Sequence, residues 1–317
     1  MDDKCEKNSS FFYSKCVLCP RRCGVDRRVS RGYCASGDVP VVNISMIHKG
    51  EEPPISGGGG SGAVFFEGCS LGCPFCQNYK ISHRARIHAA GGTAGDPAGK
   101  AVTSGELVRI FYDLQEKGAD NINLVTPMHF APDVAAAMEL ARSGGFDLPF
   151  IINCGGYENV ETVRLFDGLA DIWLPDFKFL DPKVSSALVN VSDYGETAVA
   201  AIDEMVRQTG PLVYDDRGLI RRGVIIRHLM MPSCLFDTKK IIDTIWERWG
   251  DTVALSLMNQ YTPMPQLQSM KGADPRLMRK LDPRHYRAAV DHLLILGKQN
   301  VFLQEDASGD EMIPDFI

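Results

Sequence analysis

Residues 63–76 read AVFFEGCSLGCPFC, an apolar run that leads directly into a loop with three cysteines. The run is short and contains alanine, valine and two phenylalanines, which predicts a buried β-strand over 63–67. Cys69, Cys73 and Cys76 follow at the C-terminal end of that strand. Parallel barrels form their active sites at this end of their strands, so we expect the loop to lie at a functional site.

The rest of the chain alternates between apolar runs and stretches with helical spacing. The further strands that we predict span 121–126, 149–154, 171–174, 224–231, 252–258 and 300–303. The predicted helices span 104–117, 132–142, 160–166, 196–208, 238–249 and 284–296, and Thr103 and Glu106 have the spacing of a capping box before the first. Six βα units joined by right-handed crossovers predict an α/β fold, a partial (β/α)6 TIM-like barrel, with a flat doubly wound sheet as the alternative.

A second group of cysteines precedes the barrel, at Cys16, Cys19, Cys23 and Cys34. The segment around them is too short and polar to form a core of its own, so a metal would organise it. Four thiolates satisfy either a zinc ion or a 4Fe-4S cluster, and the sequence leaves both open. We therefore divide the chain into a small cysteine-rich N-terminal metal-binding extension, residues 1–50, and a barrel domain, residues 51–317.

The composition restricts the class of partner and the compartment. The chain has 317 residues, 44% hydrophobic and 23% charged, as is usual for a globular enzyme. Its formal charge of -6 gives no general attraction to nucleic acid or anionic lipid, so we expect neither partner. No apolar run approaches the roughly 20 residues that cross a bilayer, and no secretory pattern is seen. Ten cysteines without an export signal indicate a reducing compartment, the cytoplasm.

The loop cysteines have the arrangement of an incomplete cluster ligand set. A 4Fe-4S cluster takes four ligands, so three cysteines on one loop bind three irons and leave the fourth open to a small molecule. An open iron allows chemistry beyond electron transfer. The alternatives are zinc held by three thiolates and a distant ligand, or three cysteines packed as small apolar side chains.

This CxxxCxxC loop resembles the signature of the radical S-adenosylmethionine (radical SAM) enzymes. The resemblance extends to the pyruvate formate-lyase activating enzyme-like proteins and is carried by CVLCPRRCGVDR, GEEPPISGGGGSG, CSLGCPFCQNYKIS, NINLVTPMHF, LPDFK and IIRHLMMP. It implies a 4Fe-4S cluster on Cys69, Cys73 and Cys76 whose open iron binds S-adenosylmethionine, with Phe75 near the adenine. In one respect the chain departs from the family. Activating enzymes bind the methionyl amine with a Gly-Gly-Glu segment, and here Thr126 and the three residues after it stand in that place.

The resemblance implies an oxidoreductase reduced by a flavodoxin- or ferredoxin-type electron donor. Such an enzyme cleaves S-adenosylmethionine to methionine and a 5′-deoxyadenosyl radical, which abstracts hydrogen from the substrate. A glycyl radical enzyme is one candidate protein substrate. The alternatives are radical modification of another protein, a peptide or a small molecule and, from a different class, a non-catalytic iron-sulfur electron-transfer or cluster-carrier protein.

Polar residues follow several predicted strands, as expected where strand ends form a site. Those that we assign to cofactor binding are Thr126, Asn153, Gly155, Asp176, Lys178 and Arg227, together with Phe75 of the loop. Gly155 lets backbone amides approach a ligand, and Asp176 and Lys178 orient the cofactor or form an ion pair. Arg227 suits the methionyl carboxylate, because a guanidinium binds a carboxylate through two hydrogen bonds. His129 and Tyr261 are the candidates for substrate binding or proton transfer.

Overall fold

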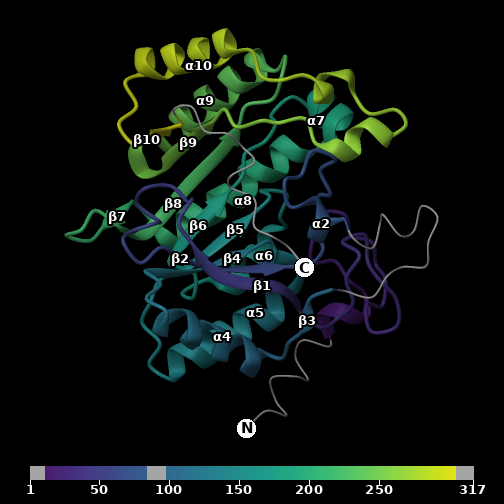
Figure 1. The fold of residues 1–317 in the computed structure, drawn as a ribbon, viewed down its shortest axis with the longest axis vertical. Helices are drawn as coiled ribbons and strands as arrows, with labels where there is room; N and C mark the ends of the chain where they lie inside the picture. The colour runs from purple at the N-terminus through teal and green to yellow at the C-terminus, as the bar shows by residue number, and fades with distance from the viewer. Residues whose placement is uncertain (1–10, 84–97, 305–317) are drawn as a thin grey trace.

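The computed structural model describes residues 11–83 and 98–304, and a ten-stranded sheet forms the centre of this part (Figure 1). Seven strands run parallel in the order β10-β9-β8-β6-β5-β4-β2. They are β2 (Ser61–Phe66), β4 (Asn121–Val125), β5 (Phe150–Cys154), β6 (Ile172–Pro175), β8 (Ile220–Leu229), β9 (Ala254–Met258) and β10 (Val301–Leu303). All seven were predicted, because strands buried on both faces have nearly continuous apolar runs.

Helical segments connect each parallel strand to the next. They are α4 (Ser104–Glu116), α5 (Ala131–Ser143), α6 (Val160–Val163) with the 3-10 turn η2 (Arg164–Phe166), α7 (Pro182–Val189), α8 (Tyr194–Thr209), α9 (Leu235–Trp249) and α10 (Pro283–Leu296). In Figure 1, α4 and α5 lie at the lower end of the sheet, and α9 and α10 at the upper end. Because the two ends of the sheet, β10 and β3, do not pair with each other, the barrel is partial, as predicted.

Helix α4 begins at the capping box that the sequence predicts. The backbone N–H of Glu106 donates to Thr103 Oγ1 at 3.3 Å, and the N–H of Thr103 donates to Glu106 Oε2 at 2.9 Å. Two backbone donors that have no partner within the helix are satisfied in this way.

The strands place alternate residues on two different cores. Along β8, for example, Val224 and Ile226 pack toward the helices, whereas Ile225 packs inside the barrel. The inner core consists of Ile55, Ile151, Ile172, Leu174, Ile220, Ile225 and Ala254. Ile55 comes from the loop before β2 and is fully buried, so this loop fills one end of the barrel.

Three strands were not predicted. β1 (Val41–His48) pairs antiparallel with β2 on one side and with the short β3 (Lys100–Ala101) on the other. β7 (Val213–Tyr214) pairs antiparallel with β8. β1 lies toward one end of the sheet, with most of its residues half-buried, and it lacks the continuous apolar run of the inner strands. It also lies within residues 1–50, so the last part of the proposed extension is built into the sheet.

The segment before β1 is fixed to the barrel by side chains from distant parts of the chain. Tyr13 donates its hydroxyl hydrogen to Asp133 of α5. Asn159 Nδ2 donates to the Val17 carbonyl at 2.7 Å, and Thr162 Oγ1 donates to the Leu18 carbonyl at 2.6 Å. The N-terminal cysteines therefore lie against the same end of the barrel as the cysteine loop.

Candidate functional site

A cavity of about 390 Å³ lies inside the barrel and reaches the C-terminal ends of the parallel strands. Its wall includes Cys69, Cys73 and Cys76 of the loop after β2. It also includes Phe75, Thr126, Asn153, Gly155, Asp176, Lys178 and Arg227, which are all seven residues that the sequence assigned to cofactor binding. The structure thus brings together residues from four strand ends and one loop, which share no local sequence pattern.

The cysteine loop is held close to the N-terminal segment by a glycine. Gly68 has φ +88°, and a Cβ atom there would stand 2.3 Å from Ser36 Oγ and 2.6 Å from the carbonyl oxygen of Cys34. Only glycine fits this position, since both the backbone angle and the space exclude a side chain. Cys73 is buried, while Cys69 and Cys76 are partly exposed.

The three loop thiols interact electrostatically. Burial raises the pKa of Cys73 above its usual range, Lys178 lowers it, and Cys69 and Cys76 raise it further. Burial also raises the pKa of Cys76 to about 11. Three thiolates this close require a bound cation to stabilise them, which fits an iron-sulfur cluster as the ligand of this loop.

In the described residues, no three Cys, His, Asp or Glu side chains are placed to hold a metal ion. In a 4Fe-4S cluster each cysteine binds a different iron, so the sulfur atoms stand further apart than around a single ion.

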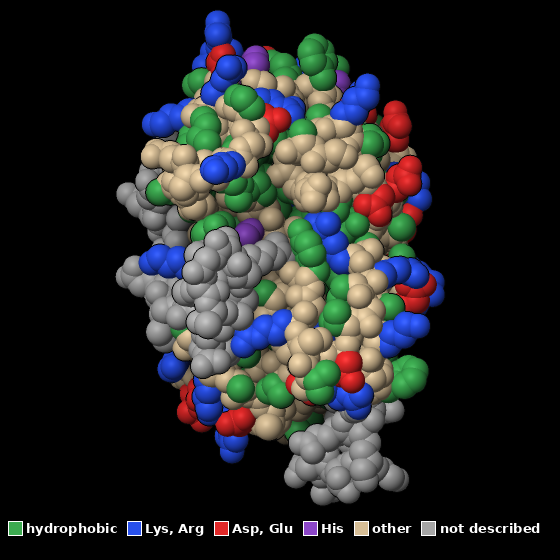
Figure 2. Space-filling model, turned by 90° about the vertical axis from the view of Figure 1, so that its right-hand side faces the viewer, with side chains coloured by type: hydrophobic (Ala, Val, Ile, Leu, Met, Phe, Trp, Pro, Cys, Tyr) green, Lys and Arg blue, Asp and Glu red, His purple; other side chains and the backbone are tan. Residues whose placement is uncertain are grey.

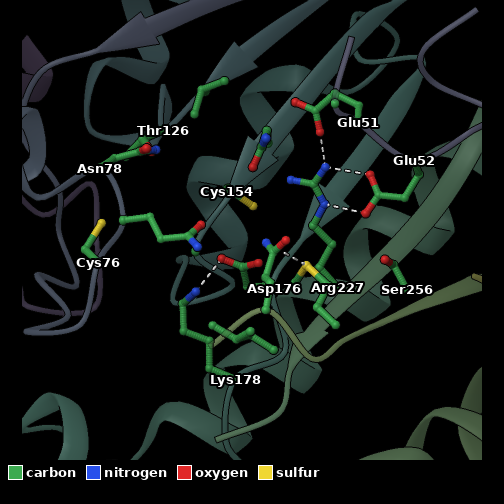
Figure 3. A pocket seen from close by; sticks show the side chains of 18 of the residues that line it. Glu51, Glu52, Cys76, Asn78, Thr126, Cys154, Asp176, Lys178, Arg227 and Ser256 are labelled. Carbon is green, nitrogen blue, oxygen red and sulfur yellow. Dashed lines mark hydrogen bonds and ion pairs between the residues drawn. The ribbon is translucent and has the colours of Figure 1, made fainter. Parts of the chain in front are cut away.

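Asp176 and Lys178 form an ion pair in the cavity wall, with 2.5 Å between Oδ2 and Nζ (Figure 3). Burial lowers the pKa of Lys178, but Asp176 and then Cys73 raise it to a net value above the usual range. The lysine is therefore cationic. It places a positive charge in the cavity wall, where it acts on the thiols of Cys73 and Cys76.

Arg227 is held by two carboxylates rather than left open to a ligand. Its Nε donates to Glu52 Oε1 at 2.8 Å and its Nη2 to Glu52 Oε2 at 2.6 Å, and Nη2 also donates to Glu51 (Figure 3). Burial disfavours the charged forms of Arg227 and Glu52. Glu51 and Glu52 nevertheless raise the pKa of Arg227, and Arg227 lowers the pKa of Glu52. Arg227 and Glu52 therefore form an ionised pair.

Sequence reasoning missed Glu51 and Glu52 as part of the site. They come from the loop before β2, where neither strand nor helix periodicity indicates which side chains face inward. Asn123 of β4 donates to Glu51 Oε1 at 2.7 Å, and Glu52 lies beside Ser256 of β9 in the cavity wall. The one available signal was two consecutive acidic residues before Pro53-Pro54 in a stretch that belonged to no predicted element.

Tyr194 of α8 was also missed, although it fixes two strand ends. Its hydroxyl lies 2.8 Å from the Gly155 carbonyl and 2.9 Å from the Asp176 carbonyl, and it accepts a hydrogen bond from the N–H of Lys178 at 3.0 Å. Gly156 faces the same Asp176 carbonyl and has φ +77°. A Cβ atom at this glycine would stand only 1.9 Å from the Asp176 carbonyl oxygen. The position of the Asp176 and Lys178 pair therefore depends on this junction.

The structure does not bring His129 or Tyr261 to the cavity wall. His129 is buried, its Nε2 lies 2.8 Å from the Glu67 carbonyl, and burial lowers its pKa to about 3. Tyr261 donates its hydroxyl hydrogen to the Leu277 carbonyl at 2.7 Å, although its ring packs against Phe75. Both side chains are hydrogen-bonded to the protein's own backbone.

The N-terminal cysteines gather next to the loop. A Cβ on Gly32 would stand 3.4 Å from both Cys23 Sγ and Cys34 Sγ, so these two sulfur atoms flank one glycine. Burial, with smaller contributions from the nearby Cys34 and Cys16, raises the pKa of Cys19 to about 12. All four sequence-predicted cysteines are therefore near one another.

On the molecular face in Figure 2, Lys and Arg side chains (blue) are interspersed with Asp and Glu side chains (red). No large area of one sign is seen among the described residues of that face. Within 11–83 and 98–304, no helix combines the length and apolar character needed to span a membrane.

Comparison with known proteins finds no matching family model. A curated relative from Methanocaldococcus jannaschii, described as uncharacterized protein MJ0674, is 28% identical over 253 residues, or 80% of this chain and 67% of that protein. Streptococcus suis SuiB bound to S-adenosylmethionine aligns with a TM-score of 0.49 and 13% identity, over 78% of this chain and 50% of SuiB. A radical SAM methyltransferase from Sphaerobacter thermophilus aligns with a TM-score of 0.48 and 16% identity, over 78% of this chain and 67% of that one. The chain spans about half the length of SuiB.

Proposed function

We propose that this chain is a radical SAM enzyme with a 4Fe-4S cluster on Cys69, Cys73 and Cys76. One observation carries the proposal: the CxxxCxxC loop lies in the wall of a cavity that also contains every residue assigned to the cofactor from sequence. A cavity of about 390 Å³ is within the range of small-molecule and cofactor sites. The donor set fits the cluster, because three thiolates leave one iron free to bind a ligand.

When bound, the cluster and S-adenosylmethionine together supply a 5′-deoxyadenosyl radical that abstracts hydrogen from the substrate. The chain's own residues place the reactants and exclude water. Phe75 provides an apolar ring beside the loop for the adenine, and Gly155 leaves backbone groups accessible at the end of β5. Lys178 balances the negative charge of the thiolates and of the methionyl carboxylate.

The role of Arg227 is indirect in this proposal. Its Nε and Nη2 already donate to Glu51 and Glu52, which leaves Nη1 alone for a ligand, so in this proposal it orients these two carboxylates instead of binding the cofactor's carboxylate through two hydrogen bonds. The cofactor's methionyl end is then bound by Lys178, Thr126 and Asn153. This arrangement also replaces the Gly-Gly-Glu segment, which the chain lacks.

As a finer proposal, the enzyme installs a glycyl radical on a partner enzyme, with electrons from a reduced flavodoxin- or ferredoxin-type donor in the cytoplasm. Another protein, a peptide or a small molecule is the alternative substrate. A cluster-carrier or electron-transfer protein would hold the same metal without cleaving anything.

The deciding experiment is anaerobic reconstitution with iron and sulfide, followed by reduction with dithionite in the presence of S-adenosylmethionine. A radical SAM enzyme releases 5′-deoxyadenosine, which is measured by liquid chromatography and mass spectrometry. A reconstituted protein that holds four irons on the loop and releases none is a carrier. Adding candidate partners, and observing which acquires a radical by electron paramagnetic resonance (EPR), then identifies the substrate.

A further inference from the structure

Among the residues that the structure describes, no carboxylate pairs with a buried arginine of the N-terminal segment, Arg27. The side chain of Arg27 is buried, and the residue is 2% exposed. Its hydrogen bonds within the described residues go to the carbonyls of Gly37 and His129 and to Cys16 Sγ, the last at 3.9 Å. The rings of Tyr13 and Phe130 pack against the guanidinium. Burying a cation without a nearby anion is costly, so this position indicates that negative charge is present beside it.

The side chains that could supply this charge are cysteines. Cys16 contacts Arg27 directly, and Cys34 acts on its charge electrostatically. Cys23 and Cys34 flank Gly32, and Cys19 lies near Cys16 and Cys34. Four neutral thiols would leave Arg27 without compensation. Four thiolates around a metal centre leave a net negative charge that compensates it.

We propose that Cys16, Cys19, Cys23 and Cys34 bind a second iron-sulfur cluster, which passes single electrons to the cluster on the loop and has Arg27 as its buried counter-charge. The electron-transfer part rests on the proposed function, whereas the cluster and its counter-charge do not.

The contact between the two cysteine groups supports the transfer of electrons between them. The backbone N–H of Cys69 donates to the carbonyl oxygen of Cys34 at 3.2 Å, so a ligand of one centre is hydrogen-bonded to a ligand of the other. Arg21, from the N-terminal group, donates through Nε to the Ser70 carbonyl and through Nη2 to the Leu71 carbonyl, both at 3.2 Å. A zinc ion at this position could hold the segment in place but could not change its oxidation state.

The electron balance is simple. A reduced flavodoxin- or ferredoxin-type donor loses one electron to the N-terminal cluster. That cluster then returns to its oxidised state by reducing the loop cluster by one electron. No bond forms or breaks in either step.

Metal analysis of anaerobically purified protein is the first test. The proposal expects about eight irons and eight sulfides per chain, since each 4Fe-4S cluster contributes about four of each. Cys19→Ser should remove about four irons, Cys73→Ser the other four, and Cys234→Ser, a buried cysteine outside both groups, none. About four irons with one zinc, or about four irons alone in the wild type, overturns the second cluster.

Redox measurements test the counter-charge and the relay. Arg27→Gln should shift the midpoint potential of the N-terminal cluster to a more negative value, because a nearby positive charge favours the reduced state. Arg27→Lys should restore most of the potential, and Arg28→Gln, which removes an exposed arginine paired with Asp26, should not change it. If Arg27→Gln does not fold, an Arg27→Lys protein with wild-type irons and a nearly wild-type potential still supports the role of charge. An unchanged potential in a folded Arg27→Gln protein contradicts it.

The relay predicts that Cys19→Ser slows reduction of the loop cluster by reduced flavodoxin. It should not slow reduction by dithionite, a small molecule that can reach the loop cluster directly. The EPR signal of the loop cluster measures both rates. Equal rates with flavodoxin in wild type and variant refute the relay. The two proposals fail separately. A wild-type N-terminal cluster in a protein that does not cleave S-adenosylmethionine removes the proposed function only.

Discussion

At the scale of single residues, the cavity depends on charges that are stable only because their partners are present. Arg227 lies between Glu51 and Glu52 in a wall from which water is largely excluded. Removing one member of such a buried group leaves an uncompensated charge behind. Loss of Arg227 should therefore destabilise the protein much more than loss of a surface arginine.

The first prediction concerns this group. Arg227→Met should lower the free energy of unfolding by about 3–5 kcal/mol, because both glutamates then remain buried without a cation. Urea unfolding of the two proteins measures the difference. Arg284→Met is the control, since its ion pair with Asp282 lies at the surface and such pairs contribute about 0–1 kcal/mol. Equal losses in the two variants contradict the account of the buried group.

The second prediction concerns the cluster ligand Cys73. Cys73→Ala should abolish both the loop cluster and the release of 5′-deoxyadenosine, while the circular dichroism spectrum stays close to that of the wild type. Cys234→Ala is the matched control, because this cysteine is also buried but does not line the cavity. Retention of the loop cluster's EPR signal in Cys73→Ala would falsify the ligand assignment.

At the scale of elements, the site depends on how closely β5 and β6 approach after they leave the sheet. Gly156 permits that approach, since a Cβ atom there would stand only 1.9 Å from the Asp176 carbonyl oxygen. A side chain at this position would have to push the end of β6 away, and with it Asp176 and Lys178. Small changes in these turns therefore act on the charges of the cavity.

The third prediction compares two glycines with nearly the same backbone angle. Gly168→Ala, at φ +76° with open space around the position, should cost about 1–2 kcal/mol from backbone strain alone. Gly156→Ala, at φ +77°, adds the 1.9 Å contact with Asp176 and should be clearly more destabilising. Thermal unfolding and S-adenosylmethionine binding check this. If Gly156→Ala binds the cofactor as well as Gly168→Ala does, the junction does not control the site.

The sequence predicted the elements that are buried on both faces, together with the side chains at their ends. It did not predict the direction in which each turn continues. Thr126, at φ +60°, lines the cavity, but the chain then turns so that His129 faces the Glu67 carbonyl. Glu51 and Glu52 reach the cavity from a loop, where no period assigns an inward face.

At the scale of the whole molecule, the buried neutral histidines His129 and His228 make stability depend on pH. Burial lowers the pKa of His228 to about 4, while its Nδ1 lies 2.7 Å from the Phe177 carbonyl and its Nε2 3.0 Å from Thr238 Oγ1. Below the ordinary histidine pKa, His228 is protonated in the unfolded chain but stays neutral in the folded chain. Stability from this group is therefore complete at neutral pH and is lost as the pH falls toward 4.

The fourth prediction follows from that sign. Between about pH 6.5 and 4, His228→Gln should reduce the slope of unfolding free energy against pH by up to about 1.4 kcal/mol per pH unit. Urea unfolding at several pH values measures the slope. A variant with the wild-type slope shows that His228 does not remain neutral in the folded protein.

The anchoring of the N-terminal segment has a consequence for how the protein is made. Residues that fix this segment lie far along the chain: Asp133 for Tyr13, Thr162 for Leu18, and the carbonyl of Asn190 for Arg21. During translation Cys16, Cys19, Cys23 and Cys34 leave the ribosome long before these partners exist. The segment can be fully anchored only after more than half of the polypeptide has been synthesised. The N-terminal segment is therefore among the last parts of the protein to reach its folded position, although it is made first.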